Sequence, residues 1–108
     1  MKKLIFVLLL MVIILSSCSK ESELELEDFA EAYIAEGYVV DLEEKPFYSF
    51  VGAIDGFIFY IGNQKVAVYE FASTKALNNS DFDFDATYGR FGLETDSEIA
   101  KTIFSNVE

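Results

Sequence analysis

Hydrophobic residues follow several patterns along the chain, and each pattern predicts a different element. Residues 4–15 form a run of twelve without a polar side chain. Residues 23–36 repeat with helical spacing and predict an amphipathic helix. Its apolar stripe comprises Leu26, Phe29, Ala30, Tyr33 and Ile34. Ser22 and Glu25 fit a capping box at the start of this helix, and Gly37 suits a left-handed residue at its end.

The segments that follow predict a strand and a short helix. Residues 38–42 are rich in β-branched and aromatic side chains, which favours a strand. Residues 43–46 then form a turn. Beyond Pro46, apolar residues at positions 47, 50, 51 and 54 predict a short helix, because proline suits a first helical position. A strand is the alternative here, since glycines interrupt the run.

The clearest prediction is a β-hairpin. Two runs with the composition of strands, 57–61 and 66–71, flank the Gly-Asn turn segment 62–65. Both faces of these runs are apolar, as expected of strands that are covered on both sides. The hairpin is therefore predicted to form the centre of the sheet.

The C-terminal third predicts smaller elements and a final helix. Residues 72–80 indicate a turn or a single helical turn, residues 81–88 alternate like a half-buried strand, and residues 90–94 indicate a further strand. Thr95 and Glu98 fit a second capping box. The apolar stripe of the last helix comprises Ile99, Ile103, Phe104 and Val107.

Together these patterns predict one α+β domain over residues 23–108. We expect an N-terminal helix, a small antiparallel sheet of three to five strands with a central hairpin, and a C-terminal helix packed on one face.

The beginning of the chain has the order of an export signal. Lys2 and Lys3 precede the apolar run. As a helix that run would be about 18 Å long, too short for the roughly 30 Å hydrocarbon core of a bilayer. The run ends in the sequence Leu15-Ser16-Ser17-Cys18. This sequence resembles the lipobox of bacterial lipoprotein precursors, which has an aliphatic residue, two small residues and a cysteine.

The resemblance implies that residues 1–17 are removed as a signal peptide. Cys18 would receive a diacylglycerol, and residues 18–22 would be the lipidated cysteine and a short tether. An ordinary secretory signal is the alternative. However, Cys18 is the single cysteine of the chain, and a lone thiol is a liability in an exported protein. The expected location is the extracytoplasmic face of a bacterial membrane.

The expected mature chain is strongly acidic. It keeps six basic residues against 19 acidic ones, a formal net charge of about −13. This charge argues against binding nucleic acid, because phosphate contacts need basic patches. It also argues against the domain lying flat on anionic lipid. The expected partners are therefore the membrane, through the anchor at Cys18, and a membrane-proximal protein.

The residue types that common catalytic sites need are scarce. The chain has no histidine, and its cysteine is the expected lipidation site, so triads and zinc sites lack their parts. Asp81, Asp83 and Asp85 are spaced like the start of a calcium loop. Ala86 and Gly92 stand where that loop needs glycine and glutamate. We expect no enzyme activity, no cofactor and no metal, with these aspartates as the weak metal candidates.

Location and composition predict a non-enzymatic protein-interaction module. The plan of the chain, small and lipid-anchored, is similar to that of exclusion lipoproteins, which implies an exclusion or immunity-type role against phage genomes or conjugative elements. The alternatives are an accessory subunit of an envelope complex and a small-ligand-binding lipoprotein. The candidate contact residues, where exposed, are Phe47, Tyr48, Tyr60 and Tyr69.

Overall fold

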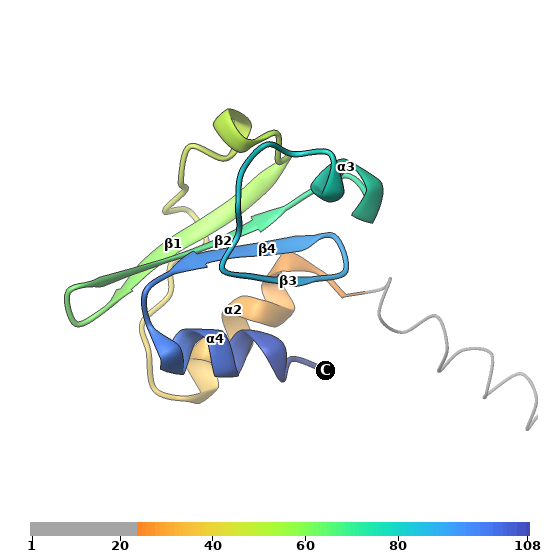
Figure 1. The fold of residues 1–108 in the computed structure, drawn as a ribbon. Coiled ribbons are helices and arrows are strands. Elements are labelled where there is room, and N and C mark those ends of the chain that lie inside the picture. Colours follow the sequence, from red (N-terminus) through yellow and green to blue (C-terminus); the bar gives the residue numbers. More distant parts are fainter. Residues whose placement is uncertain (1–23) are drawn as a thin grey trace, which may run out of the picture.

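A computed structural model describes residues 24–108, in which two helices pack on one face of an antiparallel sheet (Figure 1). The sheet has four strands in the order β1-β2-β4-β3. The elements are α2 (Leu26–Ala35), the 3-10 helix η2 (Tyr48–Val51), β1 (Asp55–Ile61), β2 (Gln64–Glu70), α3 (Thr74–Asn78), β3 (Ala86–Tyr88), β4 (Phe91–Thr95) and α4 (Glu98–Ser105). The predicted α+β class is confirmed. The predicted signal 1–17, its lipobox and the tether 18–22 lie outside the described residues.

Each face of the sheet has its own hydrophobic cluster. The first cluster lies between the sheet and the helices α2 and α4, and its largest fully buried side chains are Phe29, Tyr33, Phe57, Phe91 and Phe104. The second cluster lies on the opposite face, beneath η2, α3 and the loop before β3, and contains Val51, Ala53, Ala67, Tyr69, Phe71 and Leu77. Both clusters need apolar strand residues, which explains why the hairpin sequence is hydrophobic on both faces.

Helix α2 starts later than predicted and ends where predicted. Its N-cap is Glu25, whose N–H donates to Asp28 Oδ2 at 2.7 Å, so Ser22 is not the capping residue. At the other end, Gly37 adopts a φ of 95°. Its N–H donates to the carbonyl of Ile34 at 2.9 Å, and the next N–H donates to the carbonyl of Tyr33 at 3.2 Å. These two bonds form a Schellman motif, which turns the chain sharply back.

The prediction of a strand over residues 38–42 is wrong. The segment alternates as a strand does, since Tyr38, Val40 and Leu42 pack on the first cluster and Val39 points outward. It does not join the sheet ladder. Just after this segment, the Glu44 carbonyl accepts a hydrogen bond from the Ile58 N–H of β1 at 3.1 Å. Burial, not strand pairing, sets the alternation.

The predicted hairpin is confirmed, but only its second strand is central. β1 and β2 pair from Asp55↔Glu70 to Ile61↔Gln64. β2 also pairs with β4, whereas β1 is the edge strand. The segment 38–46 runs beside this edge and η2 covers the face, so β1 is apolar on both faces without a second strand neighbour.

The C-terminal predictions are confirmed in type and corrected in extent. α3 supplies the expected helical turn, and β4 and α4 form as predicted. The predicted strand 81–88 pairs only over Ala86–Tyr88. Thr95 belongs to β4 and does not cap α4, because the N-cap is Ser97, whose Oγ accepts from the Ala100 N–H. No helix within residues 24–108 has the length and apolar composition needed to cross a bilayer.

Candidate functional site

The three aspartates singled out as metal candidates do not converge on one point. Asp81, Asp83 and Asp85 are all exposed. Phe82 and Phe84 between them pack against the second cluster, so the carboxylates alternate outward. Asp85 Oδ2 already accepts a hydrogen bond from the Thr95 N–H at 2.9 Å. Over residues 24–108, no group of three or more histidine, cysteine or carboxylate side chains is placed to hold a metal ion.

The four aromatic contact candidates differ in their exposure to solvent. Phe47 and Tyr60 are exposed and Tyr48 is partly buried. Tyr69 is only 5% exposed, and its hydroxyl donates to Glu94 Oε1 at 2.9 Å. Burial, and then the neighbouring Glu94 carboxylate, raise the pKa of Tyr69 far above its ordinary value. Tyr69 is therefore a structural residue, and its choice as a contact candidate is wrong.

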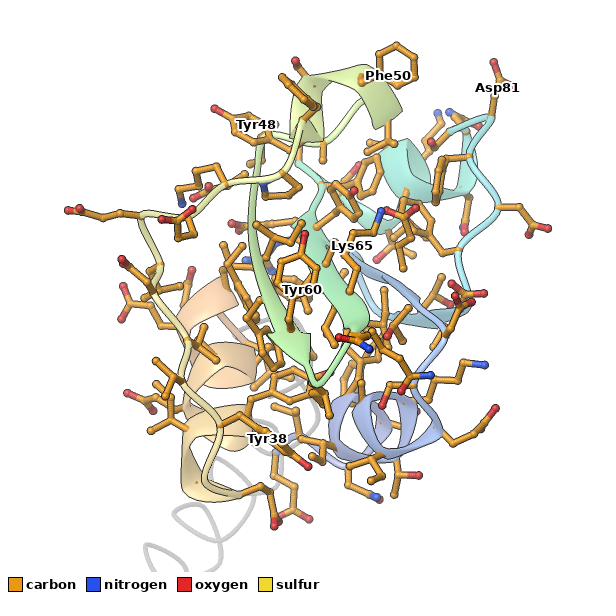
Figure 2. All side chains as sticks on the ribbon, turned by 90° about the vertical axis from the view of Figure 1, so that its left-hand side faces the viewer. Tyr38, Tyr48, Phe50, Tyr60, Lys65 and Asp81 are labelled. Atoms are coloured by element: carbon orange, nitrogen blue, oxygen red, sulfur yellow. The ribbon has the colours of Figure 1, made fainter. Side chains whose placement is uncertain are left out.

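The large exposed hydrophobic side chains gather mainly at two ends of the domain. Phe47, Phe50 and Ile54 belong to residues 47–54, which we call the aromatic loop. Ile34, Val39 and Ile99 lie instead where α2 ends and α4 begins. Figure 2 shows Phe50 and Tyr48 at one end of the molecule and Tyr38 at the other.

The second of these ends contains a shallow groove of about 380 Å³ between α2 and α4. Its lining residues are Glu36, Tyr38, Glu98, Ile99, Thr102 and Ile103. Ile99 is exposed, while Tyr38 and Ile103 are partly buried against the first cluster. We call this site the α2–α4 groove. It combines an apolar floor with two carboxylates and a hydroxyl, which is suited to side chains of a docked peptide.

Polar contacts hold the α2–α4 groove in a fixed shape. The Tyr33 hydroxyl donates to the Ala100 carbonyl at 2.8 Å and joins the two helices inside the core. Burial raises the pKa of Tyr33 far above its ordinary value, so the phenol stays protonated. At the start of α4, the Ser97 N–H donates to Thr95 Oγ1 at 3.1 Å. These bonds fix the position of Ile99 two residues beyond the cap.

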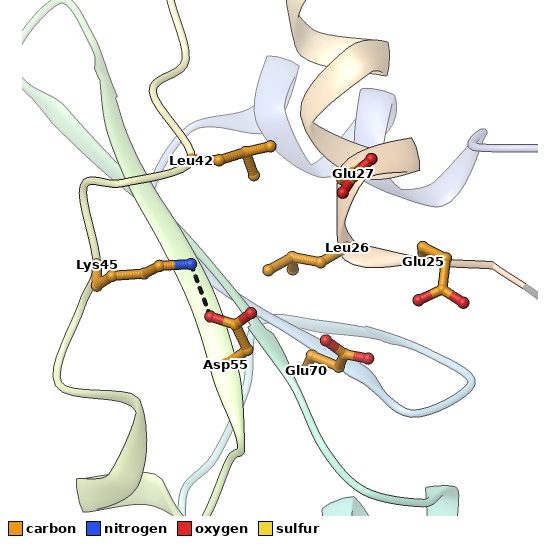
Figure 3. A pocket seen from close by; sticks show the side chains of 7 residues that line it. All are labelled: Glu25, Leu26, Glu27, Leu42, Lys45, Asp55 and Glu70. Carbon is orange, nitrogen blue, oxygen red and sulfur yellow. Dashed lines mark hydrogen bonds and ion pairs between the residues drawn. The ribbon is translucent and has the colours of Figure 1, made fainter.

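A cleft of about 310 Å³ with charged walls lies between the start of α2 and the start of β1 (Figure 3). Lys45 Nζ lies 2.7 Å from Asp55 Oδ1. Two of the lining carboxylates also contact Arg90, whose Nη2 lies 3.0 Å from Glu70 Oε2 and 3.7 Å from Glu25 Oε2. The Arg90 pairs join the N-cap of α2 to the end of β2, and the Lys45 pair holds residue 45 at the start of β1. We call this cleft the charged cleft.

Pairing controls the ionisation of Asp55. Burial raises the pKa of its carboxyl group, but hydrogen bonds from Lys45 and the Gly56 N–H, with the charge of Lys45, outweigh burial. The pKa of Asp55 therefore lies below its ordinary value, and the group stays ionised near neutral pH. A carboxylate held ionised in this way is a poor proton donor.

Sequence reasoning missed both the groove and Phe50. Phe50 falls at helical spacing with Phe47, Val51 and Ile54, a pattern that suggests a buried stripe. In the structure only Val51 of these four is buried, because η2 is too short to bury a whole stripe. Comparison with protein-family models, curated proteins and solved structures finds no match for this chain.

Proposed function

We propose that the protein is a lipoprotein, anchored through Cys18 outside a bacterial membrane, that binds another protein through the α2–α4 groove. The observation that carries the proposal is the groove itself, an apolar strip with Ile99 exposed beside Glu36 and Glu98. Contiguous exposed apolar surface beside polar side chains is typical of protein contact sites. No catalytic step is part of this proposal.

The position of the groove supports this function. α2 begins at Leu26, close to where the chain from Cys18 reaches the domain, and the groove lies beyond its other end at Ala35. A helix of ten residues is about 15 Å long. The groove thus lies at the end of α2 that is far from the expected attachment point, which leaves it accessible to a neighbouring protein.

The charges of the groove indicate the chemistry of the partner. Glu36 and Glu98 border the apolar floor, and the whole mature chain would carry a formal net charge of about −13. A segment that places an apolar side chain between Lys or Arg residues would match both features, because electrostatic complementarity favours encounter and correct orientation. The interior is not offered as a ligand site, since aromatic rings fill the space between helices and sheet.

The test is site-specific photocrosslinking in cells that carry the protein. A photoreactive residue at Ile99 should capture one membrane-proximal protein. The same residue at Thr87, exposed on β3, is the matched control and should capture little. Ile99→Glu should weaken co-purification of that protein without unfolding the domain, because Ile99 is already exposed. Equal capture from both positions would show that the groove is not the contact site.

An exclusion or immunity-type role is the more specific form of this proposal. It rests on the small, lipid-anchored plan of the chain. Cells that produce the wild-type protein should resist entry of a phage genome or a conjugative element, and cells with Ile99→Glu should resist less. Equal infection and DNA uptake with and without the protein would leave the accessory-subunit alternative, for which one stoichiometric membrane partner is expected.

A further inference from the structure

The aromatic loop holds two phenylalanine rings away from the domain. Phe47 and Phe50 are each 90% exposed. Tyr48 and Val51, their neighbours in the loop, pack on the second cluster and fix its base. Residues 46–54 contain no charged side chain. The loop is therefore an uncharged, apolar projection with a packed base on an otherwise acidic domain.

The base of this projection lies across the charged cleft from the start of α2, the first described element. The charged cleft is lined by Glu25 and Leu26 on one side and by Lys45 and Asp55, which flank the loop, on the other (Figure 3). A second connection runs from Glu25 through Arg90 to Glu70, whose carbonyl accepts from the Ile54 N–H at 2.8 Å. The start of α2 and the base of the aromatic loop are thus neighbours.

The length of chain between Cys18 and Leu24 limits how far this end can stand from a membrane. Six residue steps span at most about 20 Å when fully extended. A lipid on Cys18 would therefore keep Leu24 within about 20 Å of the bilayer surface, and the base of the aromatic loop lies across the charged cleft from the start of α2.

The charges next to the aromatic loop comprise two paired carboxylates at its base and the exposed carboxylate of Asp81, which lines a hollow beside Phe50. Asp55 and Glu70 lie at its base, and both are paired, with Lys45 and Arg90 respectively. Pairing reduces the repulsion that unpaired carboxylates would feel at a negatively charged surface. The rest of the domain keeps its excess of acidic residues, which disfavours any flatter approach to the membrane.

We infer that the aromatic loop inserts Phe47 and Phe50 into the interfacial layer of the membrane to which Cys18 is anchored. The inference rests on the proposed anchoring. Aromatic and aliphatic side chains bury favourably at the boundary between headgroups and acyl chains. Together, the lipid and the loop form two attachment points. They fix the orientation of the domain and present the α2–α4 groove outward.

Tryptophan fluorescence tests this insertion directly, because the chain contains no tryptophan. The full chain with Phe50→Trp is produced in bacteria, purified from their membranes and reconstituted into phosphatidylcholine–phosphatidylglycerol vesicles that contain brominated acyl chains. Its emission should shift to the blue and be quenched by the bromolipid. The matched control is Tyr60→Trp, an exposed ring on β1 outside the aromatic loop, which should show neither change.

Emission from Phe50→Trp that stays unshifted and unquenched in vesicles, like that of Tyr60→Trp, would overturn the inference. Protection of this tryptophan in native membranes but not in pure lipid vesicles would also overturn it, in favour of a protein that covers the loop. Mass spectrometry of the purified protein shows separately whether Cys18 carries a lipid. If no lipid is found there, coupling the cysteine to a maleimide lipid restores the tether, and quenching of Phe50→Trp then still decides whether the loop inserts.

Discussion

At the scale of the residue, Gly92 helps to set the path of the chain before β3, because it has no side chain to keep Phe84 away from β4. A Cβ at this position would lie 2.9 Å from ring atoms of Phe84. The ring therefore rests directly on the backbone of β4, and it also contacts Tyr69 and Phe71 on the second cluster. This packing holds residues 81–84 over the face of the sheet, and the chain meets β4 at Asp85, whose N–H donates to the Leu93 carbonyl at 2.8 Å.

Gly92→Ala should destabilise the domain by about 1–3 kcal/mol, since overpacking a filled core forces side chains or backbone to move. Urea unfolding followed by circular dichroism measures the change. Phe84→Leu is the partner for a double-mutant cycle, because a smaller side chain leaves room for the new methyl group. The cost of Gly92→Ala should fall in that background. An equal cost in both backgrounds would show that the ring contact is not the cause.

The Lys45–Asp55 pair predicts a small contribution to the pH dependence of stability. The pKa of Asp55 is lower in the folded chain than in the unfolded chain. The pair therefore stabilises the fold above about pH 4, and this stability is lost as the pH falls through the lowered pKa of the folded state. Its side chains are 38% and 41% exposed, so the contribution should stay below about 1 kcal/mol.

The measurement compares the free energy of unfolding of the wild type and of Asp55→Asn between neutral and acidic pH. As the pH falls, the free energy of unfolding of the wild type should decrease slightly more than that of Asp55→Asn. The two curves should therefore approach each other at low pH. Asp83→Asn, a change at an exposed carboxylate away from the charged cleft, serves as the control and should leave the curve unchanged. Parallel curves for wild type and Asp55→Asn would exclude the pair as a source of this dependence.

At the scale of the element, the start of α4 depends on a short polar network at the end of β4. The Thr95 hydroxyl donates to the Lys65 carbonyl at 2.7 Å and accepts from the Ser97 N–H. Ser97 Oγ in turn accepts from the Ala100 N–H at 3.2 Å, and Ser97 is almost fully buried. Sheet and helix are thus joined at the base of the α2–α4 groove.

Ser97→Ala should cost about 1 kcal/mol of stability, the usual loss for a serine N-cap. Chemical denaturation measures it, and amide exchange at the first turn of α4 should rise at the same time. Ser105→Ala, at an exposed serine in the last turn of the same helix, is the matched control and should change stability little. A similar loss from both changes would mean that the cap is not what fixes the start of the helix.

At the scale of the whole molecule, the described domain has an end near its first residues and an end far from them. α2 leads from the charged cleft toward the α2–α4 groove, and α4 returns from it. Just after α4, the Val107 carbonyl accepts a hydrogen bond from the Tyr88 hydroxyl at 2.9 Å, which ties the C-terminal end of the chain to β3. Both described chain ends therefore lie on the same side of the domain (Figure 1).

The proposed anchor makes a prediction at this scale. Wild-type chain isolated from bacterial membranes should begin at Cys18 and carry the added mass of a diacylglycerol, because two acyl chains are needed for stable attachment. Cys18→Ala should lose incorporation of a labelled fatty acid. Ser17→Ala keeps a small residue before the cysteine and should still be labelled. A mature wild-type chain without lipid would contradict the anchor.

The sequence determined the type and order of most elements in this protein. Local signals suffice there: helical spacing from Leu26 to Tyr33, the cap at Gly37, and the Gly-Asn turn between β1 and β2 are all short-range properties. The resemblance of Leu15-Ser16-Ser17-Cys18 to a lipobox is also local, and it remains a prediction because those residues lie outside the described structure.

Only the tertiary structure decided which residues are available to partners. Residues 38–42 and 81–84 alternate like strands, yet packing on the two clusters replaces strand pairing there. Tyr69 and Phe50 are both aromatic residues in apolar runs, but Tyr69 is enclosed by β4 and residues 82–84, whereas Phe50 projects from a short helix and is 90% exposed. Exposure depends on elements distant in the sequence, so no local pattern reveals it.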